Sequence, residues 1–269
     1  MTITTALVTG GTGTLGRLVV PRLRAAGYRV RVLSRHAREA ANGIEHVVGD
    51  LASGDGIEAA VAGTEVIVHC AGTNKGDETK AQHLVQAASR GGCRHLVFIS
   101  VVGADRVTVV SGVDRAAFGY FASKLAAERV ISESAVAWTT LRATQFHDLT
   151  LWTAAQMAKL PVIPVPAGFR FQPIDSVEVA ERLVELALGP PAGLVEDMAG
   201  PHVYPMAELV RSYLRARHMR RPLVSLWMPG KAAASIRAGA NLAPDNAVGR
   251  KTWEDFLKER VGAPGALAA

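Results

Sequence analysis

Thr9-Gly10-Gly11-Thr12-Gly13-Thr14-Leu15-Gly16 joins the apolar run Ala6-Leu7-Val8 to an amphipathic segment that carries Leu18, Val19, Val20 and Leu23. This order predicts a strand, a glycine-rich turn and a helix. The turn satisfies G-x-G-x-x-G and also the wider G-x-x-G-x-x-G spacing, both typical of dinucleotide binding. Glycines let a pyrophosphate approach the backbone, and the start of the helix aims N–H groups at it. The open alternative is a glycine-rich turn without a ligand.

Length and composition favour one large α/β domain, or such a domain with an appended lobe. The chain has 269 residues, of which 49% are hydrophobic and 20% charged, as expected for a soluble globular protein. No apolar run approaches the roughly 20 residues that span a bilayer. The first strand begins almost at Met1, which leaves no room for a signal peptide. We therefore expect a cytoplasmic protein with no membrane partner.

The cysteines and the basic residues argue against a metal protein and a nucleic-acid-binding protein. Cys70 and Cys93 have no C-x-x-C relation and no histidine at metal-ligand spacing, so we expect reduced core thiols and no metal. The formal charge is +6, and the densest basic run, Arg211 to Arg221, accompanies a predicted helix. We expect this run to be a solvated face, with a polyanion site as the minority reading. The expected partner is a small-molecule substrate, and the oligomeric state stays open.

The second predicted strand, Arg29 to Leu33, ends at Ser34 and Arg35. In a dinucleotide fold this strand end meets the adenosine ribose, where a carboxylate selects NAD and an arginine accommodates the 2′-phosphate of NADP. No acidic residue occurs here before Glu39. A guanidinium can bind the phosphate by charge-assisted hydrogen bonds, so the sequence favours NADP. The alternative is that Arg35 is an ordinary surface residue.

Four further apolar runs alternate with helical patterns and predict a parallel sheet. They are Glu45 to Leu51, Glu65 to Cys70, His95 to Ser100 and Trp138 to Arg142. Near-continuous apolar strands that alternate with helices are typical of a Rossmann-type doubly wound α/β fold. Asp50 ends one strand, where it either accepts from an adenine amino group or caps the next helix. The small pair Ala71-Gly72 ends another, where a cofactor can lie against the backbone.

A tyrosine and a lysine form the candidate catalytic pair. Periodicity fails between Val101 and Gly119, and a strong helical pattern follows in which Tyr120 and Lys124 are four residues apart. Residues at this spacing share a helix face. A tyrosine hydroxyl can act as general acid toward a carbonyl oxygen if a nearby positive charge lowers its pKa. We expect Lys124 to supply that charge; the alternative is a surface lysine beside a core tyrosine.

Proline punctuates the chain beyond Gln145 and predicts a smaller lobe of short elements. We therefore divide the chain into a dinucleotide-binding domain, residues 1–150, and a C-terminal substrate lobe, residues 151–269, packed on the sheet. Helices are expected near Ser176 to Leu188, Met206 to Arg217 and Trp253 to Arg260. Residues that follow the sixth strand are candidates for a hydrophobic substrate pocket, although ordinary packing is an equal alternative. The candidates are Phe146, His147 and Trp152, with Phe169 and Phe171 from the lobe.

The ordered series of these motifs resembles the short-chain dehydrogenase/reductases, in their atypical, NmrA-like branch. Besides the glycine turn, the resemblance rests on Ser34-Arg35, Gly49-Asp50-Leu51, His69-Cys70-Ala71-Gly72, Phe98-Ile99-Ser100-Val101-Val102-Gly103, Tyr120-Phe121-Ala122-Ser123-Lys124 and Leu141-Arg142-Ala143-Thr144-Gln145-Phe146. It covers about residues 1 to 190. It implies an NADP-binding sheet whose contacts include Leu51, Cys70 and Lys124, and a variable C-terminal lobe that shapes the substrate pocket.

Two departures from the family pattern bear on catalysis. Ser100-Val101 stands where active members often carry a Ser-Ser pair with the catalytic serine second, and His69-Cys70-Ala71-Gly72 replaces an Asn-Asn-Ala-Gly element. The leading hypothesis is an NADPH-dependent oxidoreductase that reduces a hydrophobic carbonyl or quinone, with Tyr120, Lys124 and Ser100 as catalytic residues. The first alternative is a non-catalytic NADP(H)-sensing regulator of the NmrA-like type. The second is a sugar-nucleotide epimerase or dehydratase.

Overall fold

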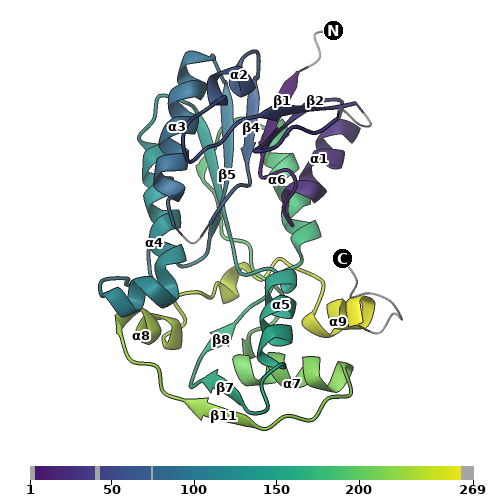
Figure 1. Cartoon of the computed structure of the whole chain (residues 1–269), viewed down its shortest axis with the longest axis vertical. Coiled ribbons are helices and arrows are strands. Elements are labelled where there is room, and N and C mark those ends of the chain that lie inside the picture. The colour runs from purple at the N-terminus through teal and green to yellow at the C-terminus, as the bar shows by residue number, and fades with distance from the viewer. Residues whose placement is uncertain (1–3, 40–42, 74, 262–269) are drawn as a thin grey trace. The chain divides into compact units, whose positions relative to one another are not determined.

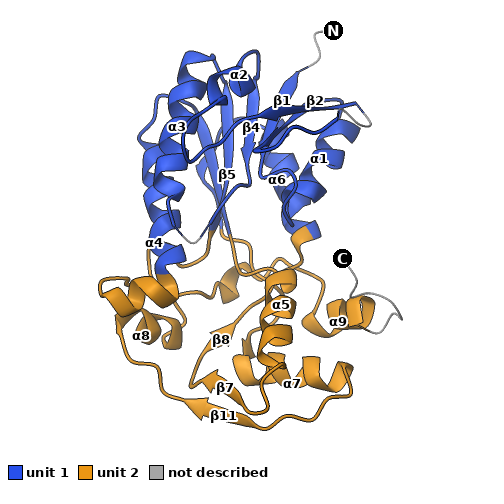
Figure 2. Cartoon of the chain, in the orientation of Figure 1, with its two compact units in different colours: residues 1–100, 119–142, 177–196 blue, residues 101–118, 143–176, 197–269 orange. Residues whose placement is uncertain are grey.

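The computed structural model describes residues 4–39, 43–73 and 75–261. The chain forms two compact units (Figure 2). Unit 1 comprises residues 1–100, 119–142 and 177–196, and unit 2 comprises residues 101–118, 143–176 and 197–269. The sequence predicts one boundary after residue 150, and the division differs because a later segment returns to unit 1. There β9 (Gly193–Leu194) pairs in parallel with β6 (Trp138–Ala143), and the Tyr28 hydroxyl donates to the Ala187 carbonyl at 3.4 Å.

Among its described residues, unit 1 contains a seven-stranded sheet with helices on both faces. The order across the sheet is β3 (Ile44–Val48), β2 (Arg29–Ser34), β1 (Thr5–Thr9), β4 (Val66–His69), β5 (His95–Val101), β6 and β9. Figure 1 shows α3 (Asp77–Arg90) and α4 (Gly112–Ser132) on one side, with α1 (Gly16–Ala25) and α6 (Ser176–Leu188) on the other. The order reverses between β1 and β4, as in a doubly wound fold. The predicted Rossmann-type α/β class is confirmed.

The central strands of unit 1 form because their apolar runs are buried on both faces. All seven residues of β5 are buried, as are all four of β4. One core cluster joins Leu7, Ile67 and Phe98 of the sheet to α2 (Ile57–Val61), α3 and α4. Burying a large aliphatic or aromatic side chain contributes about 1.5–3 kcal/mol. This packing fixes the carboxyl ends of β1, β4 and β5 relative to α4.

Helix α4 begins earlier than the sequence predicts. The segment Val101 to Gly119 was expected to be irregular, but the helix starts at Gly112. Ser111 and Asp114 cap it reciprocally, since the Asp114 N–H donates to Ser111 Oγ at 3.0 Å and the Ser111 N–H donates to Asp114 Oδ2 at 3.1 Å. Two glycines, Gly112 and Gly119, masked the helical pattern because glycine is a poor helix former.

Unit 2 is built from short strands and helices, as the proline pattern predicts. β7 (Ile163–Pro166) pairs in parallel with β11 (Leu223–Leu226), and β8 (Arg170–Phe171) pairs antiparallel with β10 (Tyr204–Pro205). The helices are α5 (His147–Met157), α7 (Met206–Ala216), α8 (Lys231–Arg237) and α9 (Trp253–Val261). α5, α7 and α9 share one apolar core around Trp253. No helix in the described part of the chain is both long enough and apolar enough to span a membrane.

Candidate functional site

The glycine turn has no room for a side chain at Gly10 and Gly16, where a Cβ would meet backbone atoms. Gly10 has φ +66°, and a Cβ on it would lie 2.7 Å from the Ala71 nitrogen. A Cβ on Gly16 would overlap the carbonyl oxygen of Gly10. The Gly13 N–H donates to the Gly10 carbonyl at 2.9 Å, while Thr12 and Gly13 are exposed. A tight, exposed backbone turn at the start of α1 therefore fits a dinucleotide pyrophosphate.

Two strand ends lie beside this turn in the sheet order and carry the residues expected at the adenosine. Ser34 ends β2 and Arg35 is exposed directly after it. The Gly49 N–H donates to the Ser34 carbonyl at 3.0 Å, so the end of β3 lies next to the end of β2. Asp50 Oδ1 accepts from the Ala52 N–H at 2.8 Å and holds a turn, and α2 begins only at Ile57. The alternative that Asp50 caps α2 is therefore wrong, whereas an adenine contact stays a prediction.

Leu51 and Cys70 differ in exposure, because Cys70 is only half-buried. Leu51 is buried, and its carbonyl lies 2.8 Å from Nδ1 of His83 on α3. Burial raises the pKa of the Cys70 thiol to about 12, opposed by the positive charge of Lys124. Cys93 is also a free thiol, and burial raises its pKa too. Thiols with raised pKa values are neutral and unreactive at neutral pH.

His69 is a buried, neutral residue that connects β1 to β4. Its Nδ1 and the Thr9 hydroxyl share a hydrogen bond of 2.6 Å, and Thr9 Oγ1 also accepts from the Ala71 N–H at 3.3 Å. The imidazole stacks on Phe98 with 5.2 Å between ring centroids. Burial first, and the Lys124 charge second, lower the pKa of His69 to about 3. This network fixes the backbone of Ala71 against the glycine turn.

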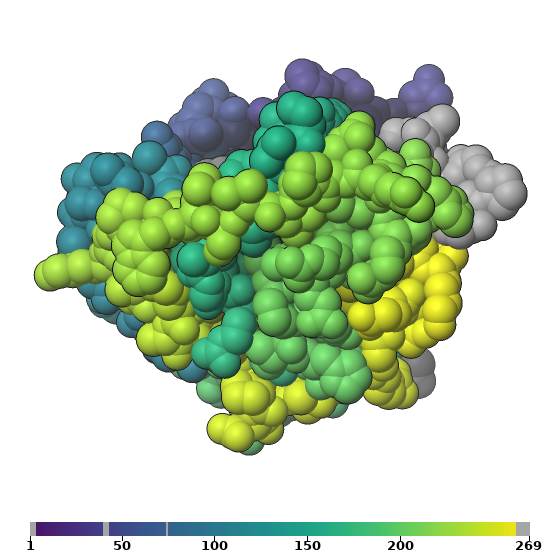
Figure 3. Space-filling model, turned by 90° about the horizontal axis from the view of Figure 1, so that it is seen from below, coloured from purple at the N-terminus to yellow at the C-terminus, as the bar shows by residue number. Residues whose placement is uncertain are grey.

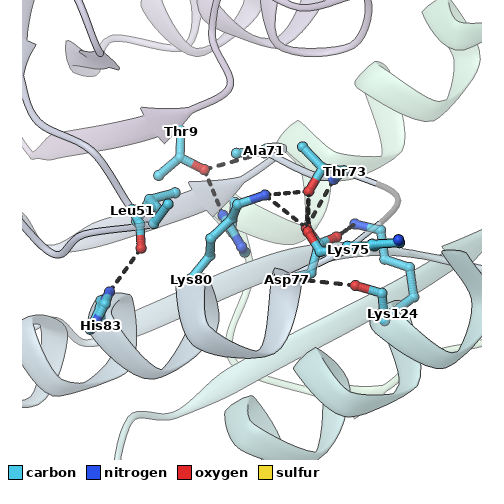
Figure 4. A network of polar contacts seen from close by, with 12 residues as sticks. Thr9, Leu51, Ala71, Thr73, Lys75, Asp77, Lys80, His83 and Lys124 are labelled. Atoms are coloured by element: carbon cyan, nitrogen blue, oxygen red, sulfur yellow. Dashed lines mark hydrogen bonds and ion pairs between the residues drawn. The ribbon is translucent and has the colours of Figure 1, made fainter. Parts of the chain in front are cut away.

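Lys124 is buried at the carboxyl end of β5. Its Nζ donates to the Ile99 carbonyl at 3.2 Å and forms an ion pair of 3.4 Å with Asp77 Oδ2 (Figure 4). It also lies 4.8 Å from the Phe98 ring centroid and 5.8 Å from that of Tyr120. A Cβ on Gly72 would lie 2.7 Å from this ammonium, so glycine there gives the lysine its space. Burial lowers the pKa of Lys124, and Asp77 opposes that shift.

Asp77 is a functional candidate that sequence reasoning missed. It lies buried in the first turn of α3, where Oδ1 accepts from the Thr73 N–H at 2.9 Å and pairs with Lys80 at 3.2 Å. Its own N–H donates to the Ser123 hydroxyl at 3.2 Å, on the turn of α4 between Tyr120 and Lys124. Figure 4 shows Thr73, Lys80 and Lys124 converging on the Asp77 carboxylate. The sequence signal that could have identified Asp77 is its position as an acidic residue in the first turn of the helix that follows β4.

The expected electrostatic role of Lys124 toward Tyr120 is wrong for this state of the protein. The pKa of Tyr120 is raised to about 12, first by burial and then by the Asp77 carboxylate. The physical reasons are the burial of the phenol and the nearby Asp77 carboxylate, which also pairs with Lys124 at 3.4 Å. The structure therefore keeps Tyr120 firmly protonated. A protonated phenol is the form that a proton donor requires.

Ser100 is the last residue but one of buried strand β5, and its hydroxyl has no hydrogen-bond partner among the described residues. It is buried in β5, and within the described residues its Oγ forms no hydrogen bond. A buried unpaired hydroxyl is unfavourable by about 1–3 kcal/mol, so such groups often face a ligand or water. Val101 follows it and is also buried. This leaves Ser100 available to a substrate oxygen.

The three predicted substrate residues have different surroundings in unit 2. His147 is fully buried, stacked on Phe256 at 5.0 Å and on Trp253 at 5.9 Å, and it is a core residue. Its Nε2 lies 3.1 Å from the Lys251 carbonyl. Trp152 is exposed, and Phe146 is half-buried beside Ile174 in an isolated bridge. The sequence could not assign these roles, because helix α5 begins at His147 and turns successive side chains to different faces.

An apolar hollow of about 120 Å³ lies nearby in unit 2. Its walls come from α5, β8 and α7, and Phe171 is the one sequence-predicted candidate among them. The lining residues are Gln145, Leu149, Thr150, Thr153, Ala154, Phe171, Met206, Leu209 and Val210. Phe169 lines a different hollow, and it is mostly buried.

Residues 10–185 match the NAD(P)H-binding family, and the chain belongs to that family. This membership, together with the shared fold, bears out the resemblance to the atypical short-chain dehydrogenase/reductases. The protein is an NAD(P)-binding, oxidoreductase-like protein. A solved NADPH-dependent quinone oxidoreductase from Escherichia coli, in complex with NADPH, has the same fold. The TM-score is 0.79 at 16% identity, over 94% of this chain and 99% of that one.

Curated relatives include two reductases. A ceramide reductase from Caulobacter vibrioides is 28% identical over 256 residues, which cover 87% of this chain and 78% of the relative. A (4-alkanoyl-5-oxo-2,5-dihydrofuran-3-yl)methyl phosphate reductase from Streptomyces griseus is 30% identical over 148 residues, or 54% of this chain. That match spans 49% of the Streptomyces protein, about half its length. These similarities support a nicotinamide cofactor and a reductase-like class.

Proposed function

We propose that the protein is an NADPH-dependent oxidoreductase that reduces a hydrophobic carbonyl or quinone compound by hydride transfer. The observation that carries the proposal is the group formed by half-buried Tyr120 with buried Lys124 and Asp77, on the two helices that follow β4 and β5. In a doubly wound sheet the carboxyl ends of such strands are where ligands bind. Relatives named as reductases support the reaction class.

The residues that follow the carboxyl ends of β1, β2 and β4 would provide the cofactor contacts. The exposed backbone of Thr12 and Gly13 would hold the pyrophosphate, and the exposed Arg35 would pair with the 2′-phosphate of NADPH. Gly72 and Lys124 would lie along the nicotinamide ribose. When bound, NADPH supplies the hydride that the substrate carbon accepts.

The proton comes from the chain itself. Tyr120 donates its phenolic proton to a substrate oxygen as the substrate gains hydride. A carbonyl takes the hydride at carbon and becomes an alcohol, whereas a quinone gains one hydride and one proton in total and becomes a hydroquinone with two O–H groups. The unpaired Ser100 hydroxyl donates a second hydrogen bond to the same oxygen. Asp77 is a positioning residue, because it holds Lys124 and the α4 backbone turn at Ser123. Solvent then reprotonates Tyr120.

A hydrophobic substrate is supported by the apolar hollow of unit 2. Leu149, Phe171 and Val210 line it, with Gln145 as a polar group that can fix orientation. We propose that this hollow of unit 2 binds an apolar group of a ligand. Its chemistry suits an aliphatic or aromatic group rather than a charged one.

The decisive experiment compares NADPH oxidation by wild type and Tyr120→Phe over a panel of carbonyl and quinone compounds. We expect turnover to fall at least about 100-fold, the usual contribution of a positioned acid, with NADPH affinity unchanged. Tyr28→Phe is the matched control. Tyr28 directly precedes β2, at the amino end of that strand, and its hydroxyl donates to the Ala187 carbonyl. Equal turnover by Tyr120→Phe and wild type would contradict the assignment of Tyr120 as the proton donor.

The cofactor is tested by thermal-shift titration with NADPH and NADH. A larger stabilisation by NADPH at matched concentration, lost in Arg35→Ala, supports the 2′-phosphate contact. Equal shifts for the two cofactors would contradict it.

A second candidate function is a non-catalytic NADP(H)-sensing regulator of the NmrA-like type. The observation that favours it is the raised pKa of Tyr120 together with the ion pair that occupies Lys124. It predicts NADPH binding with no NADPH consumption on the whole panel. In that case Tyr120→Phe and wild type would be indistinguishable in both binding and turnover.

A further inference from the structure

The net charge of the chain resides in one stretch of unit 2. Residues 205–244 contain seven arginines and lysines against the single carboxylate of Glu208. That excess of six equals the formal net charge of +6 of the whole chain, so the remaining residues are balanced. The proposed reductase chemistry uses none of these basic residues. Their concentration on one stretch calls for its own explanation.

Four of the arginines line a single surface hollow of about 510 Å³. They are Arg211, Arg215, Arg220 and Arg221, and all are exposed. The structure describes no ion pair between any of them and a carboxylate. Arg211 also lines a second hollow, of about 480 Å³, together with Arg170 and Arg237. Unpaired cations that converge on a concave surface are a place for anions.

A strained turn creates this convergence. His218 has φ +52°, a left-handed conformation that helix ends usually reserve for glycine. The Met219 N–H donates to the Leu214 carbonyl at 2.9 Å and the His218 N–H to the Arg215 carbonyl at 3.0 Å, which closes the end of α7. The chain reverses there and returns Arg220 and Arg221 to the arginines of α7. Strain of this kind is maintained where a particular arrangement of groups is retained.

An exposed apolar surface adjoins the basic hollows. β11 and β7 pair so that Val224 lies opposite Pro164, on the face away from buried Ile163. Val224 is 45% exposed, Leu226 50% and Trp227 69%. Arg237 stacks on the Trp227 ring at 3.8 Å, so the charged and apolar parts are in contact. Figure 3 looks onto the light green segment that contains these residues.

We propose that this basic apolar face binds the surface of a bilayer that contains anionic phospholipids. The arginines would contact lipid phosphates, while Trp227, Leu226 and Val224 would enter the boundary between headgroups and acyl chains. A second copy of the chain is disfavoured, because like charges would meet. Nucleic acid would leave the aliphatic side chains of β11 in water. The expectation of no membrane partner rested on the lack of a spanning segment, which a surface-bound protein does not need.

The test is sedimentation of the full chain with vesicles of phosphatidylcholine, alone or with about a third phosphatidylglycerol. We expect binding only to the anionic vesicles, weakened when salt rises from about 0.1 M to about 1 M because the screening length falls from about 10 Å to about 3 Å. Arg220→Glu with Arg221→Glu should weaken binding by about tenfold or more. Trp227→Ala should reduce the binding that persists at high salt.

The matched control is Arg29→Glu with Arg129→Glu, which makes the same charge change at exposed arginines of unit 1 and should bind as wild type does. Equal loss in the control pair, or equal binding to both kinds of vesicle, would overturn the proposal. So would thermal stabilisation by inorganic pyrophosphate without vesicle binding, tighter binding to an RNA oligonucleotide, or a dimer that the Arg220 and Arg221 changes dissociate. None of these outcomes depends on whether the protein turns over NADPH.

Discussion

The charged residues of unit 1 and those of the basic apolar face of unit 2 have opposite surroundings. We call the latter the basic face, and its arginines are Arg211, Arg215, Arg220 and Arg221. In unit 1 the buried cations have partners within the fold: Lys124 pairs with Asp77, and Arg142 forms two hydrogen bonds of 2.9 and 2.7 Å with Glu128. On the basic face, arginines such as Arg215 and Arg220 are exposed and line a hollow without acidic walls. Buried charges must be compensated for the fold to form, whereas exposed ones need no internal partner.

The difference separates charges that stabilise the fold from charges available to a ligand. Removing a partner inside unit 1 should weaken folding, and removing an arginine from the basic face should leave folding nearly unchanged. Binding experiments on the basic face are therefore interpretable, because their variants remain folded. Experiments inside unit 1 require a stability measurement beside every activity measurement.

The largest expected effect is that of Arg142→Ala. Both Arg142 and Glu128 are buried, so the change leaves a carboxylate without its bidentate partner in a low-dielectric interior. We expect unfolding in urea to become easier by about 3–5 kcal/mol. Arg129→Ala, an exposed position on the same helix as Glu128, is the control and should stay within about 0.5 kcal/mol. A small effect of Arg142→Ala would show that charge pairing does not matter to unit 1.

The next effect is a loss of stability in acid caused by His69. Its pKa is about 3 in the folded chain, against an ordinary value of 6.5, so below that value the unfolded state binds the extra proton. Stability should therefore fall as the pH falls, by about 1.4 kcal/mol per unit, or about 2 kcal/mol at about pH 5. His69→Gln should reduce this slope by one proton in urea unfolding at several pH values. Exposed His36→Gln should not, and an unchanged slope in His69→Gln would reject the assignment.

Gly10→Ala should affect both folding and cofactor binding. Gly63 provides a matched control, because its φ is +69° against +66° for Gly10 but nothing lies within 4 Å of its Cβ position. Gly63→Ala should be destabilising by about 1–2 kcal/mol from backbone strain alone. Gly10→Ala should exceed that and remove NADPH binding in the thermal-shift assay, because its Cβ meets Ala71. Equal effects of the two variants would mean that the turn is not a close-contact site.

The smallest effect is expected on the basic face. Arg220→Ala and Arg221→Ala together should change the free energy of unfolding by about 0.5 kcal/mol or less, because exposed and unpaired side chains contribute little. Relief of like-charge repulsion makes slight stabilisation the favoured sign. Urea unfolding beside wild type measures this change. Destabilisation comparable to that of Arg142→Ala would show that the arginines of the basic face also stabilise the fold.

Much of the sheet was predictable because its strands are short, mostly apolar runs that alternate with helical patterns. The glycine spacing predicted a tight turn, and the structure contains one, with Gly10 and Gly16 at positions where a Cβ meets backbone. The start of α4 was missed because Ser111 and Asp114 signal it through a reciprocal cap while glycines weaken the pattern. The return of residues 177–196 to unit 1 was missed because strand pairing between β6 and β9 leaves no local sequence signal.

The candidate site was predictable only in part. The i, i+4 spacing placed Tyr120 and Lys124 on one helix, but Asp77 lies 47 residues before Lys124 and reaches it only through the packing of α3 beside α4. Burial first, and that carboxylate second, raise the pKa of Tyr120, opposite to the expected shift. His147 follows the sixth strand as a pocket residue would, yet α9, more than 100 residues later, covers it with Trp253 and Phe256.

The sequence by itself determined the doubly wound sheet, the glycine turn and the family, because these depend on local periodicity, on residues without a Cβ and on motif order. The tertiary structure alone decided which charges are compensated. It paired Lys124 with Asp77, and it turned the chain at His218 so that arginines from two segments line one hollow. Electrostatic energy depends on distance in space, and distance in space between remote residues is set only when the chain has folded.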